Sequence, residues 1–171
     1  AQGSSTITAR LALEAELAAM APLERPDLRL PLRVELAGTL EAQAALDQLE
    51  AVRREALALQ HEGTVLASLV RAAGIAAEID PGTAAQYALA GLALSARRQS
   101  TMLLPAEPWL HCARALHAAG DTAQAMQLLA TGRDWLQHTA RQHVPEPFRD
   151  SFLNRNPVNR ELLALASRLG V

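Results

Sequence analysis

Apolar residues recur at helical spacing along most of the chain, and this periodicity limits its fold more than any other feature. Between residues 31 and 60 they are Leu32, Leu36, Leu40, Leu46, Leu49, Val52, Ala56 and Leu59. Residues three or four positions apart share one face of an α-helix. Half of the 171 residues are hydrophobic, but only 3% are aromatic. Because the β-branched and aromatic runs of strands are nearly missing, the sequence predicts an all-α fold.

Breaks containing proline, glycine or capping residues divide this pattern into about eight helices. We expect a first helix to about residue 20, with Ser5 or Thr6 as its N-cap. Further helices are expected over residues 65–79, 84–98, 109–118, 122–142 and 157–169, and two more between 31 and 60. The stretch 31–60 is long for one globular helix, so we favour a turn near residues 43–46, although a single long helix stays open. The three prolines of residues 21–31 predict a loop there. Consecutive helices joined by short turns pack antiparallel.

The segment Pro108 to Leu136 resembles one tetratricopeptide repeat, a helix–turn–helix unit of 34 residues. The matching positions are Trp109, Ala113, Leu116, Gly120, Ala125, Leu129 and Gly132. Gly120 stands in the turn between the two helices, where glycine supplies a positive φ. The family's closing proline is absent, and Gln137 takes its place. The resemblance implies antiparallel helix pairs stacked as a right-handed solenoid, which leaves a curved surface.

A second resemblance lies in the last segment, from Val144 to Gly170, and its core runs from Arg149 to Arg160. This segment is similar to the tail after helical repeats in large bacterial signalling ATPases and in transcriptional regulators of the SARP and MalT-like LuxR classes. Such a domain would be a regulatory arm that receives an inducer or a partner and controls a separate effector. The chain has neither a GxxxxGK[ST] loop nor a basic recognition helix.

We therefore interpret residues 1–171 as a single helical-repeat domain cut from a larger protein. Residues 1–5 would be a linker, and residues 144–171 would cap the C-terminal end of the array. In this cap we expect structural roles for Arg149, Asp150, Asn156 and Pro157, with Arg149 and Asp150 tying the proline turn to the last helix. Asn156 followed by Pro157 is typical of an N-cap and the first position of a helix.

The charge balance argues against nucleic acid and membranes as direct partners. The chain has 16 basic and 18 acidic residues, so its net charge is −2. Such a balance produces no long-range field toward an anionic surface. No stretch of about 18 uncharged apolar residues could span a membrane. The single Cys112 cannot form an internal disulfide, which fits a reducing cytoplasm.

The sequence predicts neither a cofactor, a metal site nor catalysis. His111 and His117 are six positions apart, and His138 and His143 are five apart, so neither pair has the i, i+4 spacing of a helical metal site. We expect the histidines to lie at the surface or at helix caps. Cys112 is expected to face a neighbouring helix as a small apolar residue. A GxSxG motif is also absent, so we expect the protein not to be an enzyme.

The resemblance places the functional surface on the concave face, which is lined by the first helix of each pair. The candidate residues of this face are Arg71, Glu78, Glu107, Leu110, Arg114 and His117. Arg114 would pair with a carboxylate, with His117 beside it; the alternative is that both are ordinary solvated residues.

Three functional hypotheses follow from these features. The first is a regulatory or scaffolding module that binds a protein, a peptide or a small effector. The second is homo-oligomerisation through an apolar helix face between Leu30 and Leu59. The third is a small-molecule sensor, which requires a pocket rather than an open groove.

Overall fold

A computed structural model describes residues 2–21 and 25–171, and within these ranges the fold is helical and contains no strand. The α-helices are α1 (Gln2–Met20), α2 (Pro26–Ala37), α3 (Ala42–Ala58), α4 (Glu62–Ala76), α5 (Pro81–Ser95), α6 (Glu107–Ala118), α7 (Thr122–Gln142) and α8 (Pro157–Arg168). A 3-10 turn (Glu146–Phe148) and a π-helical turn (Ser151–Arg155) separate α7 from α8. The predicted all-α class is confirmed, with slightly more helical elements than the eight expected.

Short polar side chains cap the N-termini of three of the helices. The carboxylates of Asp80 and Asp121 accept hydrogen bonds from backbone N–H groups in the first turns of α5 and α7. The side chain of Asn156 does the same for α8, and Pro157 follows at the first helical position. These contacts satisfy N–H groups that have no partner inside the helix. The predicted cap of the last helix is confirmed.

Positive φ angles occur at Gly120 (92°) and Gly170 (76°). Gly120 therefore makes the turn between α6 and α7 as predicted, and Gly170 follows the end of α8. A side chain at either position would be strained, because L residues rarely adopt this conformation.

The stretch 31–60 forms two helices, so the single long helix is excluded. The turn between them lies at residues 38–41 rather than 43–46. The loop predicted for residues 21–31 is too long, because α2 begins at Pro26 and contains Pro31. A proline at the start of a helix removes an N–H that has no intrahelical partner, and one in the next turn removes a single hydrogen bond.

The first helix begins earlier than the sequence analysis predicted. Residues 2–5, expected to be a linker, belong to α1, and Ser5 and Thr6 lie inside this helix instead of capping it. A long run of good helix formers, Ala9 to Ala19, extends the helix without a strong stop signal on its N-terminal side. None of the described helices is long and apolar enough to cross a membrane.

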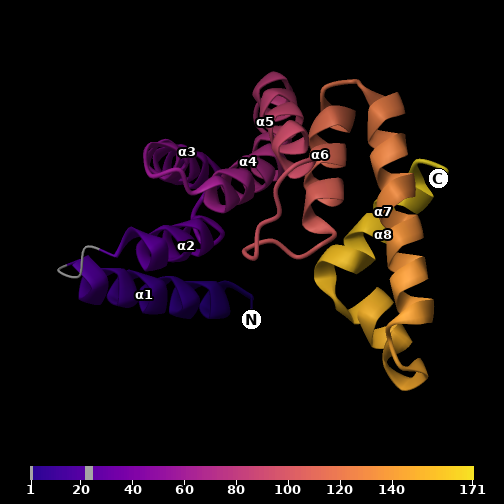
Figure 1. The fold of residues 1–171 in the computed structure, drawn as a ribbon, viewed down its shortest axis with the longest axis horizontal. Helices are drawn as coiled ribbons and strands as arrows, with labels where there is room; N and C mark the ends of the chain where they lie inside the picture. The colour runs from indigo at the N-terminus through magenta and orange to yellow at the C-terminus, as the bar shows by residue number, and fades with distance from the viewer. Residues whose placement is uncertain (1, 22–24) are drawn as a thin grey trace.

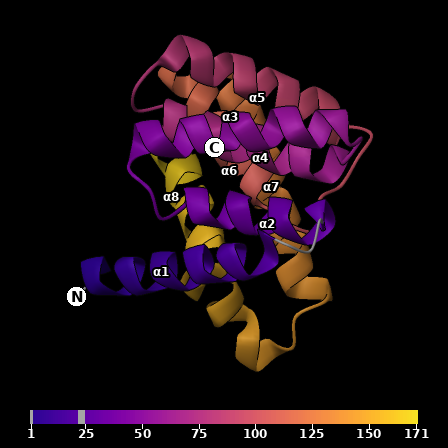
Figure 2. The same ribbon diagram turned by 90° about the vertical axis from the view of Figure 1, so that its left-hand side faces the viewer.

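The helices follow one another around an arch, with α1 and α2 at one end and α7 and α8 at the other (Figure 1). Each α-helix packs against the next one in sequence. The even-numbered helices also contact one another, since α4 touches both α2 and α6, and α6 touches α8. They therefore form an inner row. Viewed from the N-terminal end, α1, α2, α3 and α5 are layered one above another (Figure 2).

Small residues let the helices of the α6–α7 pair approach closely. Ala113 of α6 and Ala125 of α7 are fully buried. A β-carbon on Gly132 would lie 2.7 Å from Leu162 Cδ1 and 3.1 Å from Trp109 Cβ. A side chain here would force Leu162 and Trp109 to shift. The other residues of the predicted repeat signature, Leu116 and Leu129, are also in the core.

The C-terminal segment is held mainly against the end of α7. Arg149 donates hydrogen bonds to the carbonyl oxygens of Val144 (3.1 Å) and Arg141 (3.2 Å). Asp150 accepts a hydrogen bond from Asn154 at 2.8 Å. We expected Arg149 and Asp150 to tie the proline turn to the last helix. Instead Arg149 satisfies carbonyl groups at the C-terminal end of α7, where orphan acceptors are available.

Candidate functional site

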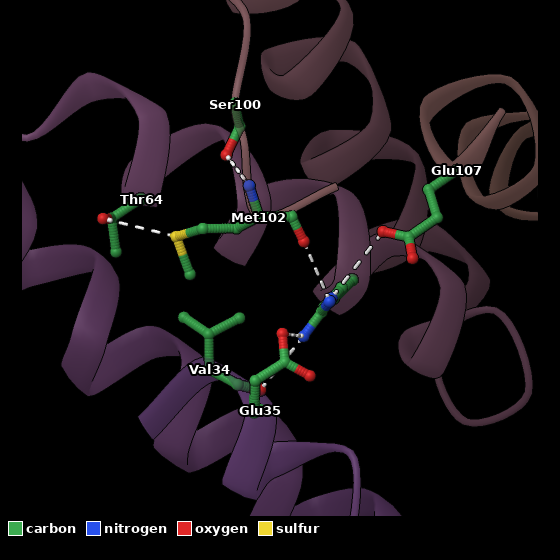
Figure 3. Close-up of polar contacts among 7 residues, drawn as sticks. Val34, Glu35, Thr64, Ser100, Met102 and Glu107 are labelled. Atoms are coloured by element: carbon green, nitrogen blue, oxygen red, sulfur yellow. Dashed lines mark hydrogen bonds and ion pairs between the residues drawn. The ribbon is translucent and has the colours of Figure 1, made fainter. Parts of the chain in front are cut away.

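Arg71 of α4 is the centre of a polar network on the inner row of helices, and Figure 3 labels the residues that surround it. Its guanidinium lies 2.8 Å from Glu35 of α2 and 3.8 Å from Glu107 at the start of α6. It also donates to the carbonyl oxygens of Met102 (3.1 Å) and Val34 (3.4 Å). One side chain therefore joins three helices and the connection between α5 and α6.

The connection between α5 and α6, residues 96–106, is held in place by this network. The carbonyl oxygen of Met102 accepts the hydrogen bond from Arg71. The sulfur of Met102 lies 3.7 Å from the hydroxyl oxygen of Thr64, which donates to it. The backbone N–H of Met102 donates to Ser100 Oγ at 3.3 Å. A segment without regular structure is thus anchored to α4 at one residue through both its backbone and its side chain.

Glu107 is the buried acid of the network. Burial raises the pKa of its carboxyl group, and the nearby guanidinium of Arg71 opposes this shift. Its Oε2 atom is buried and has no hydrogen-bond partner among the described residues. The 3.8 Å ion pair with Arg71 is therefore its main electrostatic compensation.

His111 lies one turn after Glu107 on α6 and packs against Gly74 of α4. Its Nδ1 atom is buried and has no hydrogen-bond partner among the described residues. Burial, with the nearby charges of Arg114 and Arg71, lowers the pKa of the imidazole to about 4. The prediction of a surface or capping histidine is therefore wrong here, because the glycine on α4 lets the ring enter the interface between the two helices.

The structure brings only some of the predicted site residues together. Arg71 and Glu107 are partners, whereas Arg114 pairs with Glu161 of α8 at 2.7 Å. His117 is exposed, and its Nδ1 lies 3.2 Å from Oγ1 of Thr122, the first residue of α7.

Two further predicted site residues are elsewhere. Glu78 is exposed beyond the end of α4, apart from the network. Leu110, predicted to face the groove, is 1% exposed and belongs to the core. Helix α6 contacts α4, α5, α7 and α8. Fewer of its residues therefore face solvent than would be expected if α6 packed only against α7.

Sequence reasoning missed Glu35, Glu161 and His111. Each acquires its role from a residue on another helix, 36 positions away for Glu35 and 47 for Glu161. Nothing in the local sequence distinguishes these acids from solvated ones. Only the packing of the even-numbered helices brings Glu35 beside Arg71 and Glu161 beside Arg114.

A separate pocket of about 500 Å³ lies between the 96–106 connection, α6 and α7. Trp109 of α6 and Trp135 of α7 form one wall, and their ring centroids are 5.6 Å apart at an interplanar angle of 45°. Leu66, Leu103, Leu104, Pro105 and Pro108 add further apolar surface. Its polar lining consists of Ser95, Arg98, Gln99 and Ser100. Its volume lies within the range of small-molecule sites, and apolar residues outnumber polar ones in its lining.

Metal-binding clusters and cysteine thiols are two kinds of reactive group that could support chemistry in the described part of the chain. Among the described residues, no group of three or more His, Cys, Asp and Glu side chains is arranged to hold a metal ion. Cys112 is buried as predicted, and burial raises the pKa of its thiol to about 12. A thiol in this state is a poor nucleophile, since the thiolate is the reactive form.

Comparisons with known protein families, with curated proteins and with solved structures found no match to this chain.

Proposed function

We propose that this chain is a non-catalytic helical-repeat module that binds a protein or peptide segment on its inner row of helices. In this proposal the helix pairs α2–α3, α4–α5 and α6–α7 stack as a tetratricopeptide-like right-handed solenoid, and α8 closes the array. The observation that carries it is the direct contact of α2 with α4, α4 with α6, and α6 with α8. In stacked helix pairs, such a row of first helices forms the recognition surface.

The charges along this row suit a partner that carries both acidic and basic side chains. The side chains of Glu35, Arg114 and Glu161 are 51%, 37% and 43% exposed, so they can reach a bound segment. Arg71 and Glu107 are 19% and 10% exposed and act mainly as support. Complementary charges of this kind contribute specificity and speed of association more than affinity.

The resemblance of the C-terminal segment to bacterial regulators suggests where such a module would operate. As an arm of a transcriptional regulator or signalling ATPase, it would receive a partner and control an effector domain elsewhere in the same protein. Arg149 and Asn156, which hold this segment in place, support the role of a structural cap.

A peptide selection followed by charge reversal tests the proposed binding face. Random peptides would be selected on the purified chain, and their dissociation constants would be measured for Glu35→Arg and Arg114→Glu. Both variants should weaken binding by about tenfold or more, because each places a like charge against the partner. The control is Arg54→Glu on α3, a 71% exposed arginine outside the inner row. A selection without binders, or binders indifferent to both inner-face variants, would contradict the proposal.

The tryptophan pocket supports a second candidate, a small-molecule effector site. A thermal-shift screen against a metabolite collection tests it, with Trp135→Leu as the pocket variant. A ligand that stabilises the chain, and no longer does so in this variant, would support effector binding. The absence of any such ligand would contradict this candidate without affecting the peptide-binding proposal.

The apolar face suggested for homo-oligomerisation is partly buried within the chain. Leu30 and Leu49 are fully buried within the chain, whereas Leu57 and Leu59 near the end of α3 are exposed. A second copy would therefore meet chiefly Leu57 and Leu59 of that face.

A further inference from the structure

The two tryptophans of the chain meet in the pocket beneath the 96–106 connection. Trp109 and Trp135 are the only tryptophans in the sequence, and both line this pocket. Each is half-buried, so part of the indole surface stays open. Flat aromatic surfaces favour planar ligands, because offset or tilted ring contacts add to the burial of apolar area.

The polar side of this pocket is rich in hydrogen-bond donors. Arg98 uses its Nε for the ion pair with Glu62, and its remaining N–H groups have no partner among the described residues. Ser100 Oγ accepts a hydrogen bond from the backbone of Met102, which leaves its own O–H free to donate. The side-chain amide of Gln99 is likewise unpaired within the described chain.

No acidic side chain lines this pocket, and one arginine does. Among described residues, neither indole N–H has an acceptor. The pocket therefore offers a ligand hydrogen-bond donors, a positive charge and aromatic surface. A carboxylate complements such donors well, because charge-assisted hydrogen bonds are stronger than neutral ones.

We propose that this pocket binds a small planar aromatic carboxylate, with its ring against Trp109 and Trp135 and its carboxylate at Arg98 and Ser100. The inference names the ligand class for the effector-binding candidate and rests on that candidate. It requires only that Arg98 share its charge between Glu62 and the ligand.

Intrinsic fluorescence measures binding at this pocket directly, since every tryptophan of the chain lies in it. The intact chain would be titrated with phenylacetate into the millimolar range, with excitation at the red edge of indole absorption. The matched probes are phenylacetamide, which lacks the charge, and cyclohexylacetate, which lacks the planar ring. We expect a saturable change with phenylacetate and weaker binding of both other probes, by about fivefold or more.

Two substitutions with opposite expected effects on phenylacetate affinity make the test more specific. Arg98→Gln should weaken phenylacetate binding about five- to tenfold, because the cation is lost. Glu62→Gln should tighten it about twofold, because Arg98 no longer shares its charge with an exposed carboxylate. Arg97→Gln is the matched control, since this exposed neighbour does not line the pocket and should change binding less than twofold.

Three results would overturn the inference: no saturable change with phenylacetate, equal or tighter binding of the amide, or unchanged affinity in Arg98→Gln. The effector-binding candidate fails separately if the metabolite screen finds no ligand that depends on Trp135. If that screen yields a neutral or cationic ligand that depends on Trp135, the pocket is an effector site and only the ligand class is wrong.

Discussion

Gly74 of α4 and the imidazole of His111 on α6 are so close that a β-carbon on Gly74 would lie 2.3 Å from His111 Nδ1. No ordinary side chain contact is this short, so glycine at this position allows the two inner helices to approach with the ring between them. The relationship joins adjacent helix pairs, and it makes the interface sensitive to a single methyl group.

We expect Gly74→Ala to lower the free energy of unfolding by about 1–3 kcal/mol, as overpacking typically does. Gly91→Ala on α5 is the matched control, because its β-carbon would meet Val70 Cγ2 at 3.5 Å, an ordinary contact. This control should be neutral or stabilising by about 0.5–1 kcal/mol, since alanine favours helices over glycine. Urea denaturation followed by circular dichroism measures both. Equal effects of the two substitutions would contradict the packing described here.

The neutral state of His111 should make stability depend on pH. Its pKa is about 4 in the folded chain, compared with 6.5 for an ordinary histidine. Between these values the unfolded state binds more protons, so the free energy of unfolding rises with pH and falls on acidification. The histidine can contribute at most on the order of 3 kcal/mol.

Urea titrations from pH 4 to 7 would measure this contribution in the wild type, in His111→Gln and in the exposed control His138→Gln. We expect a shallower slope only in His111→Gln, because this substitution removes the buried titrating group. Identical slopes in all three proteins would show that the imidazole is accessible to protons in the folded state.

Loss of Arg71 should loosen the 96–106 connection as well as destabilise the fold. Arg71→Met keeps an apolar stem but removes the bond to Met102 and leaves the buried Glu107 without its cation. We expect a loss of about 2–4 kcal/mol, because an uncompensated buried charge is costly. Hydrogen exchange at residues 99–103 should become faster.

The double variant Arg71→Met, Glu107→Gln should regain part of this loss, since no buried charge is left. Arg54→Met serves as the control, because the Arg54 side chain is 71% exposed and its ion pair with Glu50 is 3.9 Å long. We expect a change below about 0.5 kcal/mol. A double variant as unstable as Arg71→Met alone would show that Glu107 is not the source of the cost.

The thiol of Cys112 should be unreactive in the folded protein. It is fully buried, and burial raises its pKa to about 12. At mildly alkaline pH, we expect a disulfide reagent to react at least about 100-fold more slowly with the native chain than with the chain in urea. Absorbance of the released thiolate follows the reaction, and similar rates in both conditions would contradict the burial of Cys112.

The boundaries that sequence reasoning predicted well depend on short-range interactions. Gly120 and Asn156 act through backbone angles and hydrogen bonds within one turn of the chain, so the sequence alone reveals the turn and the cap. The early start of α1 and the inclusion of Pro31 in α2 were missed, because local signals there are weak or misleading.

The repeat resemblance identified close-packed small residues but not the surface that they create. Ala113 and Ala125 are buried where the pattern predicted contact between two helices. Leu110 was assigned to the groove from the same pattern, yet it lies in the core. A repeat pattern describes one pair of helices, whereas exposure depends on every neighbouring pair.

By itself, the sequence determined the helical class, most of the turns and the absence of familiar catalytic motifs. Only the tertiary structure decided that Arg71 meets Glu35, that His111 packs on Gly74 and that Trp135 joins Trp109 in one pocket. The reason is physical: helices and turns form from interactions among residues a few positions apart, but the partners of a side chain on a helix surface depend on how distant helices pack.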